Sequence, residues 1–246
     1  SGLRRMVDSP LHYLGRLESR SRGHEILDAL AEMVMRAGLE VGDRLPPEVQ
    51  MAQQLGVGRS TIREALNRWE GLGLIRRRRG IGTFLVAPIP PPGGPVDPDV
   101  RLEGAAVLRL LEVRATLETG MARFAAQRAT PAQKAEIDRL CTELLAVVGR
   151  GEAYQEADTA FHTAIADASA NPIFTQLLAH LDRAFDRAEG SPFNRAAFGR
   201  ESFAYHRPLA DAVVAGDPDA AETAVLDIIA SVRGEVVAIM RAGTDG

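Results

Sequence analysis

The stretch from Leu45 to Leu66, LPPEVQMAQQLGVGRSTIREAL, decides the fold of the N-terminal part of the chain. Its two adjacent prolines suit the first turn of a helix, and Gly56 is suited to ending that helix. After Gly58 the run RSTIREAL predicts a second helix, for which Ser60 is the predicted N-cap. Two short helices joined at a glycine-marked turn are typical of a helix-turn-helix. The arginines and hydroxyls that begin the second helix indicate a surface that meets phosphates.

The segments on either side of this stretch complete a winged helix-turn-helix domain. Apolar residues recur at helical spacing over residues 23–37, which predicts a preceding helix. Residues 74–77 and 83–86 are predicted to be short strands around a basic, glycine-containing turn. We therefore expect a small β-hairpin wing and place the DNA-binding domain at residues 23–86, after an N-terminal extension formed by residues 1–22.

The remainder of the chain is predicted to be helical. Residues 87–100, APIPPPGGPVDPDV, are rich in proline and glycine and are expected to form a linker. Residues 101–241 show helical periodicity without the alternation of strands, which predicts an all-α bundle of about six helices. Two of the expected helices cover residues 103–128 and 194–215. The predicted fold class is thus mostly α, a winged helix-turn-helix followed by an all-α helical bundle.

Composition and charge narrow the possible functions. With 46% hydrophobic residues, the 246-residue chain can bury sizeable cores. Its net charge of −4 conceals an asymmetry, because residues 1–86 carry +4 and residues 87–246 carry −8. The N-terminal part is therefore the one suited to a polyanion. No apolar run is long enough to span a membrane and no signal peptide is evident, so we expect a cytoplasmic protein.

The pattern LPPE…LGVGRSTIREAL…GLI…GIGTFLV resembles the GntR superfamily of bacterial transcription regulators, FadR subgroup, and the resemblance extends over residues 23–241. It implies that the second helix of the motif enters the major groove and that the wing tip enters the minor groove. The residues that the resemblance implies as DNA contacts are Gly58, Arg59, Ser60, Thr61, Arg63, Arg79 and Gly80. Ordinary solvated surface charge is the alternative interpretation of these arginines. Val49 stands where members of the family often have a basic residue, so the operator sequence does not follow from the resemblance.

A second informative stretch, YQEADTAFHTAIADASANP, lies in the helical part of the chain. Asp158 and His162 are four residues apart, so on a helix they can bind one divalent ion or pair with each other. The stretch resembles the FCD effector-binding domain, which implies Asp158, His162 and His206 as ligands of a divalent metal. The resemblance also implies a further histidine at position 228, where this chain has Ile228. The imidazoles favour Zn²⁺ or Ni²⁺. A domain without metal, which holds its effector by hydrogen bonds alone, is the alternative.

The same resemblance suggests two effector-binding residues. Arg114, in LLEVRATLETGMARFAA, corresponds to an arginine that faces the ligand cavity and would suit a small carboxylate. An i,i+4 ion pair with Glu118 is the alternative for Arg114. Asn171 is either an effector contact or a helix cap in front of Pro172.

Together these observations favour a transcription regulator, usually a repressor in this subgroup. It is expected to act as a homodimer on a near-palindromic DNA operator under the control of a small organic acid. A helical metalloenzyme with an appended nucleic-acid-binding module is the main alternative, and an architectural DNA binder without an effector is another. No arrangement of nucleophile and base is evident in the sequence, so we expect that the protein is not an enzyme.

Overall fold

The computed structural model describes Leu14 and residues 22–93, 96–185, 191–194 and 197–242. The chain divides into two compact units. One contains residues 1–106 and 240–246, and the other contains residues 107–239. Each unit is described by itself. No helix in the described ranges combines the length and the apolar character needed to cross a membrane.

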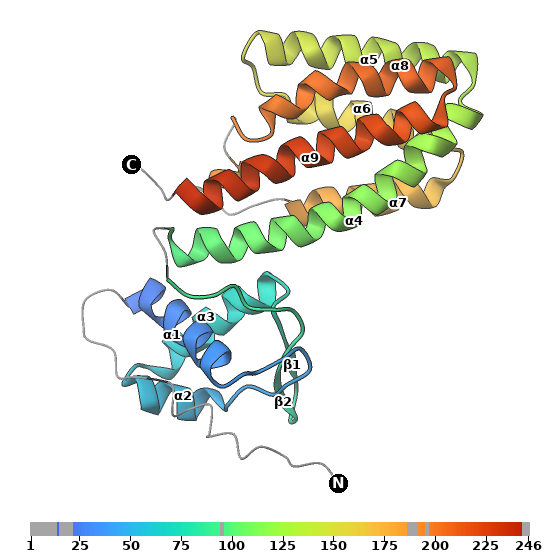
Figure 1. Ribbon diagram of the computed structural model, residues 1–246. Helices are drawn as coiled ribbons and strands as arrows, with labels where there is room; N and C mark the ends of the chain where they lie inside the picture. The colour runs from blue at the N-terminus through green and yellow to red at the C-terminus, as the bar shows by residue number, and fades with distance from the viewer. Residues whose placement is uncertain (1–13, 15–21, 94–95, 186–190, 195–196, 243–246) are drawn as a thin grey trace. The chain divides into compact units, whose positions relative to one another are not determined.

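The first unit is a winged helix-turn-helix (Figure 1). It contains α1 (Arg22–Arg36), α2 (Glu48–Leu55), α3 (Arg59–Gly71), β1 (Ile75–Arg78) and β2 (Gly82–Leu85). The two strands are antiparallel, with Ile75 opposite Leu85 and Arg78 opposite Gly82. The predicted helices and hairpin are therefore confirmed.

Two glycines determine the turns of this unit. Gly56 ends α2 in the left-handed conformation, with φ of 68°, and its amide bonds back to the last turn of the helix. Gly82 has φ of 142°, and a Cβ there would lie 2.4 Å from the Arg44 side chain. The predicted cap at Ser60 is wrong, because Gly58 is the N-cap of α3 and Ser60 lies in its first turn.

The core of the first unit is formed by the apolar faces of α1, α2 and α3, with Trp69 fully buried among them. The expected linker is only partly irregular, because α4 (Pro98–Arg128) begins at Pro98 instead of residue 103. Asp97 accepts a hydrogen bond from the Asp99 amide at 2.8 Å, which caps this earlier start. Leu102, in the second turn of α4, is buried in the core of the first unit. The first turns of α4 are thus part of the first unit.

The second unit is an all-α bundle, as the sequence predicts (Figure 1). Besides the rest of α4, it contains α5 (Pro131–Gly149), α6 (Gln155–Ala168), α7 (Pro172–Phe185), α8 (His206–Ala215) and α9 (Pro218–Ala242). Helix α5 packs against α6 and α8, and α6 packs against α7. Thr130 and Gln133 form a capping box at the start of α5.

One expected helix of the bundle is broken. The prediction of a single helix over residues 194–215 is wrong, because Arg200–Tyr205 form a 3₁₀ helix and α8 starts only at His206. Gly199, with φ of 79°, precedes this tighter segment. A second 3₁₀ turn covers Pro192–Asn194. The change in helix type matters for function, because it brings Ser202, Phe203 and His206 to one cavity.

Candidate DNA-binding surface and effector cavity

The first turn of α3 presents most of the residues predicted to contact DNA. Arg59 and Ser60 are exposed, Thr61 is half-buried, and the Arg63 side chain is 56% exposed. Four backbone amides at the start of a helix have no partner within that helix, and they attract anions. Gly58 has φ of −67°, which any residue can adopt, and a Cβ there would make only ordinary contacts. Its predicted role therefore depends on close approach of DNA and stays a prediction.

Arg79 and Gly80 lie at the exposed tip of the wing, between β1 and β2. Gly80 has φ of 74°, a conformation that favours glycine in such a turn. The structure thus places these two residues at the end of the hairpin, where the sequence analysis expects them. Their contact with the minor groove stays a prediction.

Arg77 connects the wing to α3, and sequence reasoning missed it. Its guanidinium donates to the Asn67 side-chain oxygen at 2.5 Å and to the Arg63 carbonyl at 3.3 Å. Its backbone amide donates to Glu70 at 2.9 Å. These bonds fix β1 against α3. The run of four arginines in the sequence did not show which one faces the helix.

Glu48, at the start of α2, holds Arg63 through an ion pair of 3.4 Å. Because both side chains are partly exposed, such a pair contributes only about 0.2–1 kcal/mol. Arg63 can therefore leave Glu48 for a phosphate or a base at little cost.

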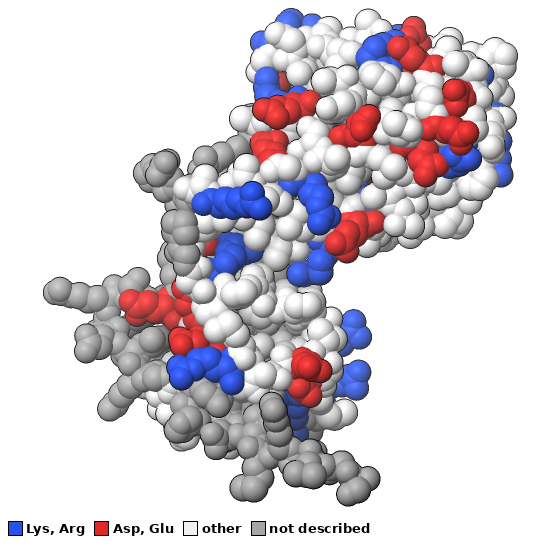
Figure 2. Space-filling model, viewed as in Figure 1, with Lys and Arg blue, Asp and Glu red and all other residues white. Residues whose placement is uncertain are grey.

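In the bundle, unlike at the start of α3 and at the wing tip, basic and acidic side chains alternate over the surface. On the face shown in Figure 2, basic and acidic side chains are interspersed over the helical unit. Arg139, for example, pairs with Glu136 and Glu143 at 2.7 and 2.8 Å. These neighbouring opposite charges do not present a surface suited to a polyanion.

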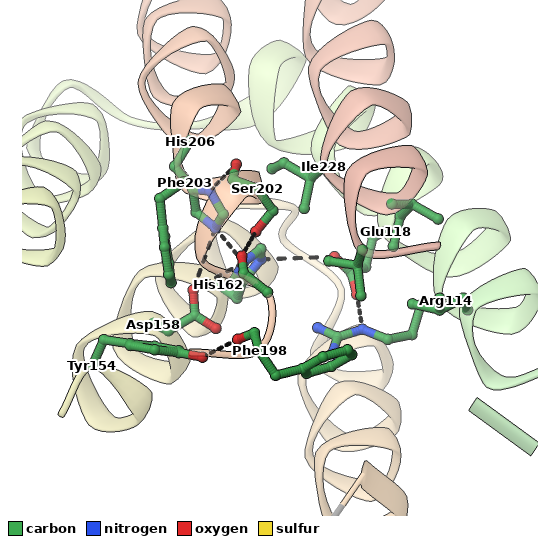
Figure 3. Close-up of a pocket in the computed structure, with 14 residues that line it drawn as sticks. Arg114, Glu118, Tyr154, Asp158, His162, Phe198, Ser202, Phe203, His206 and Ile228 are labelled. Carbon is green, nitrogen blue, oxygen red and sulfur yellow. Dashed lines mark hydrogen bonds and ion pairs between the residues drawn. The ribbon is translucent and has the colours of Figure 1, made fainter. Parts of the chain in front are cut away.

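The bundle contains a partly open cavity of about 140 Å³ (Figure 3). Its walls come from α4, α6, α8, α9 and the 3₁₀ segment before α8. The polar lining includes Arg114, Glu118, Tyr154, Asp158, His162 and His206. The apolar lining includes Leu111, Phe198, Phe203, Ile228, Ile229 and Val232. A ligand in this cavity would meet charged groups and an apolar wall together.

The three predicted metal ligands come together in this cavity. Within the described part of the chain, Asp158, His162 and His206 form the group whose geometry could hold a metal ion. The Asp158 Oδ1 atom lies 3.6 Å from His162 Nε2 and 3.3 Å from His206 Nε2, and the two Nε2 atoms are 3.3 Å apart. Ligands of tetrahedral Zn²⁺, each about 2.0–2.1 Å from the ion, are separated by about 3.4 Å. The donor set therefore fits a divalent metal.

The partners of the two imidazoles indicate which ring nitrogens are available. His206 Nδ1 lies 3.1 Å from the Ser202 carbonyl oxygen, which can only accept, so Nδ1 carries the proton and Nε2 is bare. His162 Nδ1 faces the Glu118 carboxylate at 3.7 Å, which favours the same tautomer. Both Nε2 atoms then lie close to Asp158 Oδ1, an atom that is shielded from solvent and lacks a hydrogen-bond partner. Three acceptors that converge in this way require a cation or a proton between them.

Burial adjusts the ionisation of this group. Desolvation lowers the pKa of His162, which favours the neutral imidazole that a metal needs. Burial opposes ionisation of Asp158, but the positive charge of a protonated His162 or His206 outweighs it, so the pKa of Asp158 is lowered. At neutral pH the cluster therefore offers the Asp158 carboxylate and the neutral imidazole of His162.

Arg114 satisfies both interpretations that the sequence left open. It lines the cavity, and its Nε donates to the Glu118 carboxylate four residues further along α4 (Figure 3). Glu118 is only 2% exposed and reaches toward both Arg114 and His162. The sequence analysis considered Glu118 only as a partner of Arg114. Its position beside the candidate metal ligands depends on the tertiary structure, which brings Glu118 of α4 within 3.7 Å of His162 on α6.

The remaining predicted residues are placed as follows. Ile228 is buried and lines the cavity, so the expected position of a further histidine is occupied by an apolar wall. Asn171 does not line the cavity; its side-chain oxygen accepts from the Ile173 amide at 3.1 Å and caps α7. Tyr154, which the sequence analysis did not select, lines the cavity and donates to the Phe198 carbonyl. Its spacing of four residues before Asp158 is the signal that could have found it.

Comparison with known proteins identifies both units. Residues 23–85 match the family of bacterial regulatory proteins, gntR family, and residues 109–231 match the FCD domain. The chain is 31% identical over 207 residues to the HTH-type transcriptional regulator LutR of Bacillus subtilis (strain 168), a match that covers 82% of this chain and 94% of the relative. It is 32% identical over 218 residues to the galactonate operon transcriptional repressor of Escherichia coli (strain K12), which covers 84% of this chain and 93% of the relative.

A solved structure shares the fold. The GntR family member from Pseudomonas syringae pv. tomato str. DC3000 aligns with a TM-score of 0.50 at 17% identity, covering 97% of this chain and 98% of that one. The chain belongs to the GntR family of bacterial regulatory proteins, and it is a DNA-binding transcription regulator with an FCD effector-binding domain.

Proposed function

We propose that this regulator binds a near-palindromic operator as a homodimer, and that a small carboxylate held beside a divalent metal in the bundle cavity controls that binding. The observation that carries the proposal is the convergence of Asp158, His162 and His206 on one point of a cavity that also contains Arg114. Zn²⁺ or Ni²⁺ suits two imidazoles and one carboxylate better than Mg²⁺ does.

The charges of the cavity support an anionic effector only when a cation is present. Among the described lining residues, Arg114 and Glu118 form an ion pair, so Asp158 leaves a net negative charge when the imidazoles are neutral. An organic acid would be repelled by this charge. A divalent ion would supply the positive charge that reverses the balance, and Asp158, His162 and His206 would hold it. The apolar wall at Ile228 would contact the carbon skeleton of the acid.

Two relatives have names that agree with such an effector, the galactonate operon repressor and the putative L-lactate dehydrogenase operon regulator of Escherichia coli. Galactonate and lactate are both small hydroxy acids. We propose the same chemical class for this chain, and repression as its mode of action. Because the protein acts on DNA, we also propose that it is cytoplasmic.

The DNA-binding role of α3 follows from its exposed first turn. Arg59 and Arg63 can each donate two parallel hydrogen bonds to guanine, and Ser60 and Thr61 can bind phosphate oxygens. Arg79 and Gly80 would follow the neighbouring minor groove. Because a two-fold symmetric dimer presents two recognition helices, its operator is expected to be a near-palindrome.

Exposed apolar side chains support the homodimer. Val113 on α4 and Ile173 and Leu177 on α7 are each about half exposed. Helices α4 and α7 are neighbours, since the rings of Phe124 and Phe174 are 6.0 Å apart. A second copy of the chain would cover these side chains. Sedimentation of the wild-type chain should give twice the monomer mass; a monomer at micromolar concentration would contradict this part of the proposal.

The metal is tested by elemental analysis of the purified protein after dialysis without chelator. Wild type should contain close to one zinc or nickel per chain, and Asp158→Ala should lose it. Glu156→Ala is the matched control, because Glu156 is an exposed carboxylate on the same helix that does not line the cavity. Wild type without metal would remove the metal from the proposal and leave hydrogen bonds to hold the effector.

A further inference from the structure

Glu118 occupies an unusual position in the bundle. Its carboxylate is 2% exposed, and burial of a carboxylate is costly unless it is paired. One oxygen accepts from Arg114 Nε, and the other lies 3.7 Å from His162 Nδ1. A distance of 3.7 Å is too long for a hydrogen bond. Glu118 is therefore bonded to Arg114 and close to His162, without yet being bonded to the imidazole.

The Nδ1 atom of His162 lacks the partner that Glu118 could supply. His162 is 95% buried, and its Nδ1 atom has no hydrogen-bond partner. A buried nitrogen without a partner costs free energy, and a small movement of Glu118 would satisfy it. Histidines that bind metals usually donate the other ring N–H to a carboxylate or a carbonyl, which fixes the tautomer and strengthens the ligand. His206 already has such a partner in the Ser202 carbonyl, whereas His162 does not.

We propose that Glu118 is the positioning residue of His162 and that Arg114 controls it by competing for the same carboxylate. When Arg114 holds Glu118, the imidazole lacks its acceptor and the metal site is weak. When an anion occupies Arg114, Glu118 can close on Nδ1 and orient Nε2 toward the metal. This inference rests on the metal site proposed above, and it makes the binding of anion and metal mutually reinforcing.

The chemistry predicts opposite effects for two neighbouring substitutions on α4. In Glu118→Gln, the amide can still accept from Arg114, but its nitrogen would donate to His162 Nδ1. The ring proton would then move to Nε2, the atom that the metal needs. In Arg114→Met, Glu118 loses its competing partner and is released toward His162. A purely structural role of the pair would weaken metal binding in both variants.

The experiment measures Zn²⁺ affinity of the full chain in competition with a chromophoric chelator. Glu118→Gln should bind Zn²⁺ roughly 10–100-fold more weakly than wild type, because its amide nitrogen would turn the ring proton of His162 onto the atom that the metal needs; changes in outer partners of metal-binding histidines have effects of this size. Arg114→Met should bind about tenfold more tightly, and the same substitution in the Glu118→Gln background should gain about threefold or less. This smaller gain in Zn²⁺ affinity would come only from removing the positive charge of Arg114, which repels the metal ion.

Each outcome has a definite meaning. Equal affinities of wild type and Glu118→Gln would overturn the role of Glu118. An undiminished gain from Arg114→Met in the Glu118→Gln background would overturn the control by Arg114. If Glu118→Gln folds poorly, the double variant still tests the idea, because it removes both charges of the pair together. Failure of wild type to bind Zn²⁺ would instead overturn the metal site itself, so the two failures are distinguishable.

Discussion

The DNA-binding surface and the effector cavity are built in different ways. Four of the residues predicted to contact DNA are consecutive, residues 58–61, and they form the N-cap and the start of α3. The cavity, in contrast, takes its polar lining from residues as far apart as Arg114 and His206, on several helices. A local surface can be predicted from a local pattern, whereas a cavity depends on how distant elements pack. The two regions should also differ in their tolerance of substitutions, because a substitution in the cavity affects contacts among several elements.

The largest effect is expected from a substitution that places a histidine in the cavity. Ile228→His should strengthen Zn²⁺ binding on the order of 100-fold, because sites with four ligands bind with about 10–16 kcal/mol in total and one ligand contributes about a quarter. The measurement is the competition assay described above. Asp227→His is the control, since Asp227 is exposed and does not line the cavity. Equal effects of both substitutions would mean that the wall at Ile228 does not face the metal.

The local surface is tested by Arg59→Ala. Loss of one bidentate contact should weaken operator binding by about 1–3 kcal/mol, roughly 5–150-fold, with a smaller loss on random DNA. Fluorescence anisotropy at fixed salt measures both. Arg139→Ala, which removes an equally exposed arginine from the bundle, should leave both affinities within about twofold. Equal losses on operator and random DNA for Arg59→Ala would contradict base reading and indicate a phosphate contact.

A third prediction tests whether the DNA-binding surface also depends on the contacts between the wing and α3. Arg77→Leu removes the bonds to Asn67 and to the Arg63 carbonyl, so the wing should lose its fixed position against α3. We expect unfolding free energy to fall by about 1–3 kcal/mol, since each net hydrogen bond contributes about 0.5–1.5 kcal/mol. Operator affinity should fall several-fold. The single tryptophan, Trp69, is buried in this unit and reports its unfolding by fluorescence.

Arg76→Leu is the matched control for Arg77→Leu, because Arg76 is exposed on the same strand. If both substitutions had the same effect on the Trp69 transition, the contacts of Arg77 would not be what holds the wing.

The smallest expected effect is a pH dependence of the metal-free bundle. The folded-state pKa of His162 is lowered by burial, so below about pH 6.5 the unfolded chain binds more protons than the folded one. The free energy of unfolding is therefore unaffected by His162 above about pH 6.5. As the pH falls below 6.5, this free energy decreases by at most about 1.4 kcal/mol per pH unit. Urea unfolding of chelator-treated protein, followed by circular dichroism at pH 7.5 and 5.5, measures it.

His162→Gln should flatten this dependence, whereas His180→Gln, which changes an exposed histidine, should not. The Trp69 signal should shift less with pH than the circular dichroism does, because Trp69 lies in the other unit. A pH dependence that survives His162→Gln would assign the effect to other groups.

The order of helices and the hairpin were predictable because periodicity, glycines and prolines act locally. The start of α4 and the break before α8 were not. The sequence predicted an irregular stretch up to residue 100, but Leu102 is buried in the first unit and Asp97 caps the helix earlier. Likewise, nothing local in the sequence indicated that residues 200–205 would form a 3₁₀ helix.

The sequence by itself determined the winged helix-turn-helix, the helical bundle and the Asp158–His162 pair of the candidate metal site, because short motifs carry residue type and spacing together. His206 followed only from the resemblance to the FCD domain. Only the tertiary structure decided that Glu118 lies between Arg114 and His162 and that Arg77 holds the wing. The physical reason is that a side chain's charge partners depend on distances across elements, which the packing of helices establishes and spacing along the chain does not.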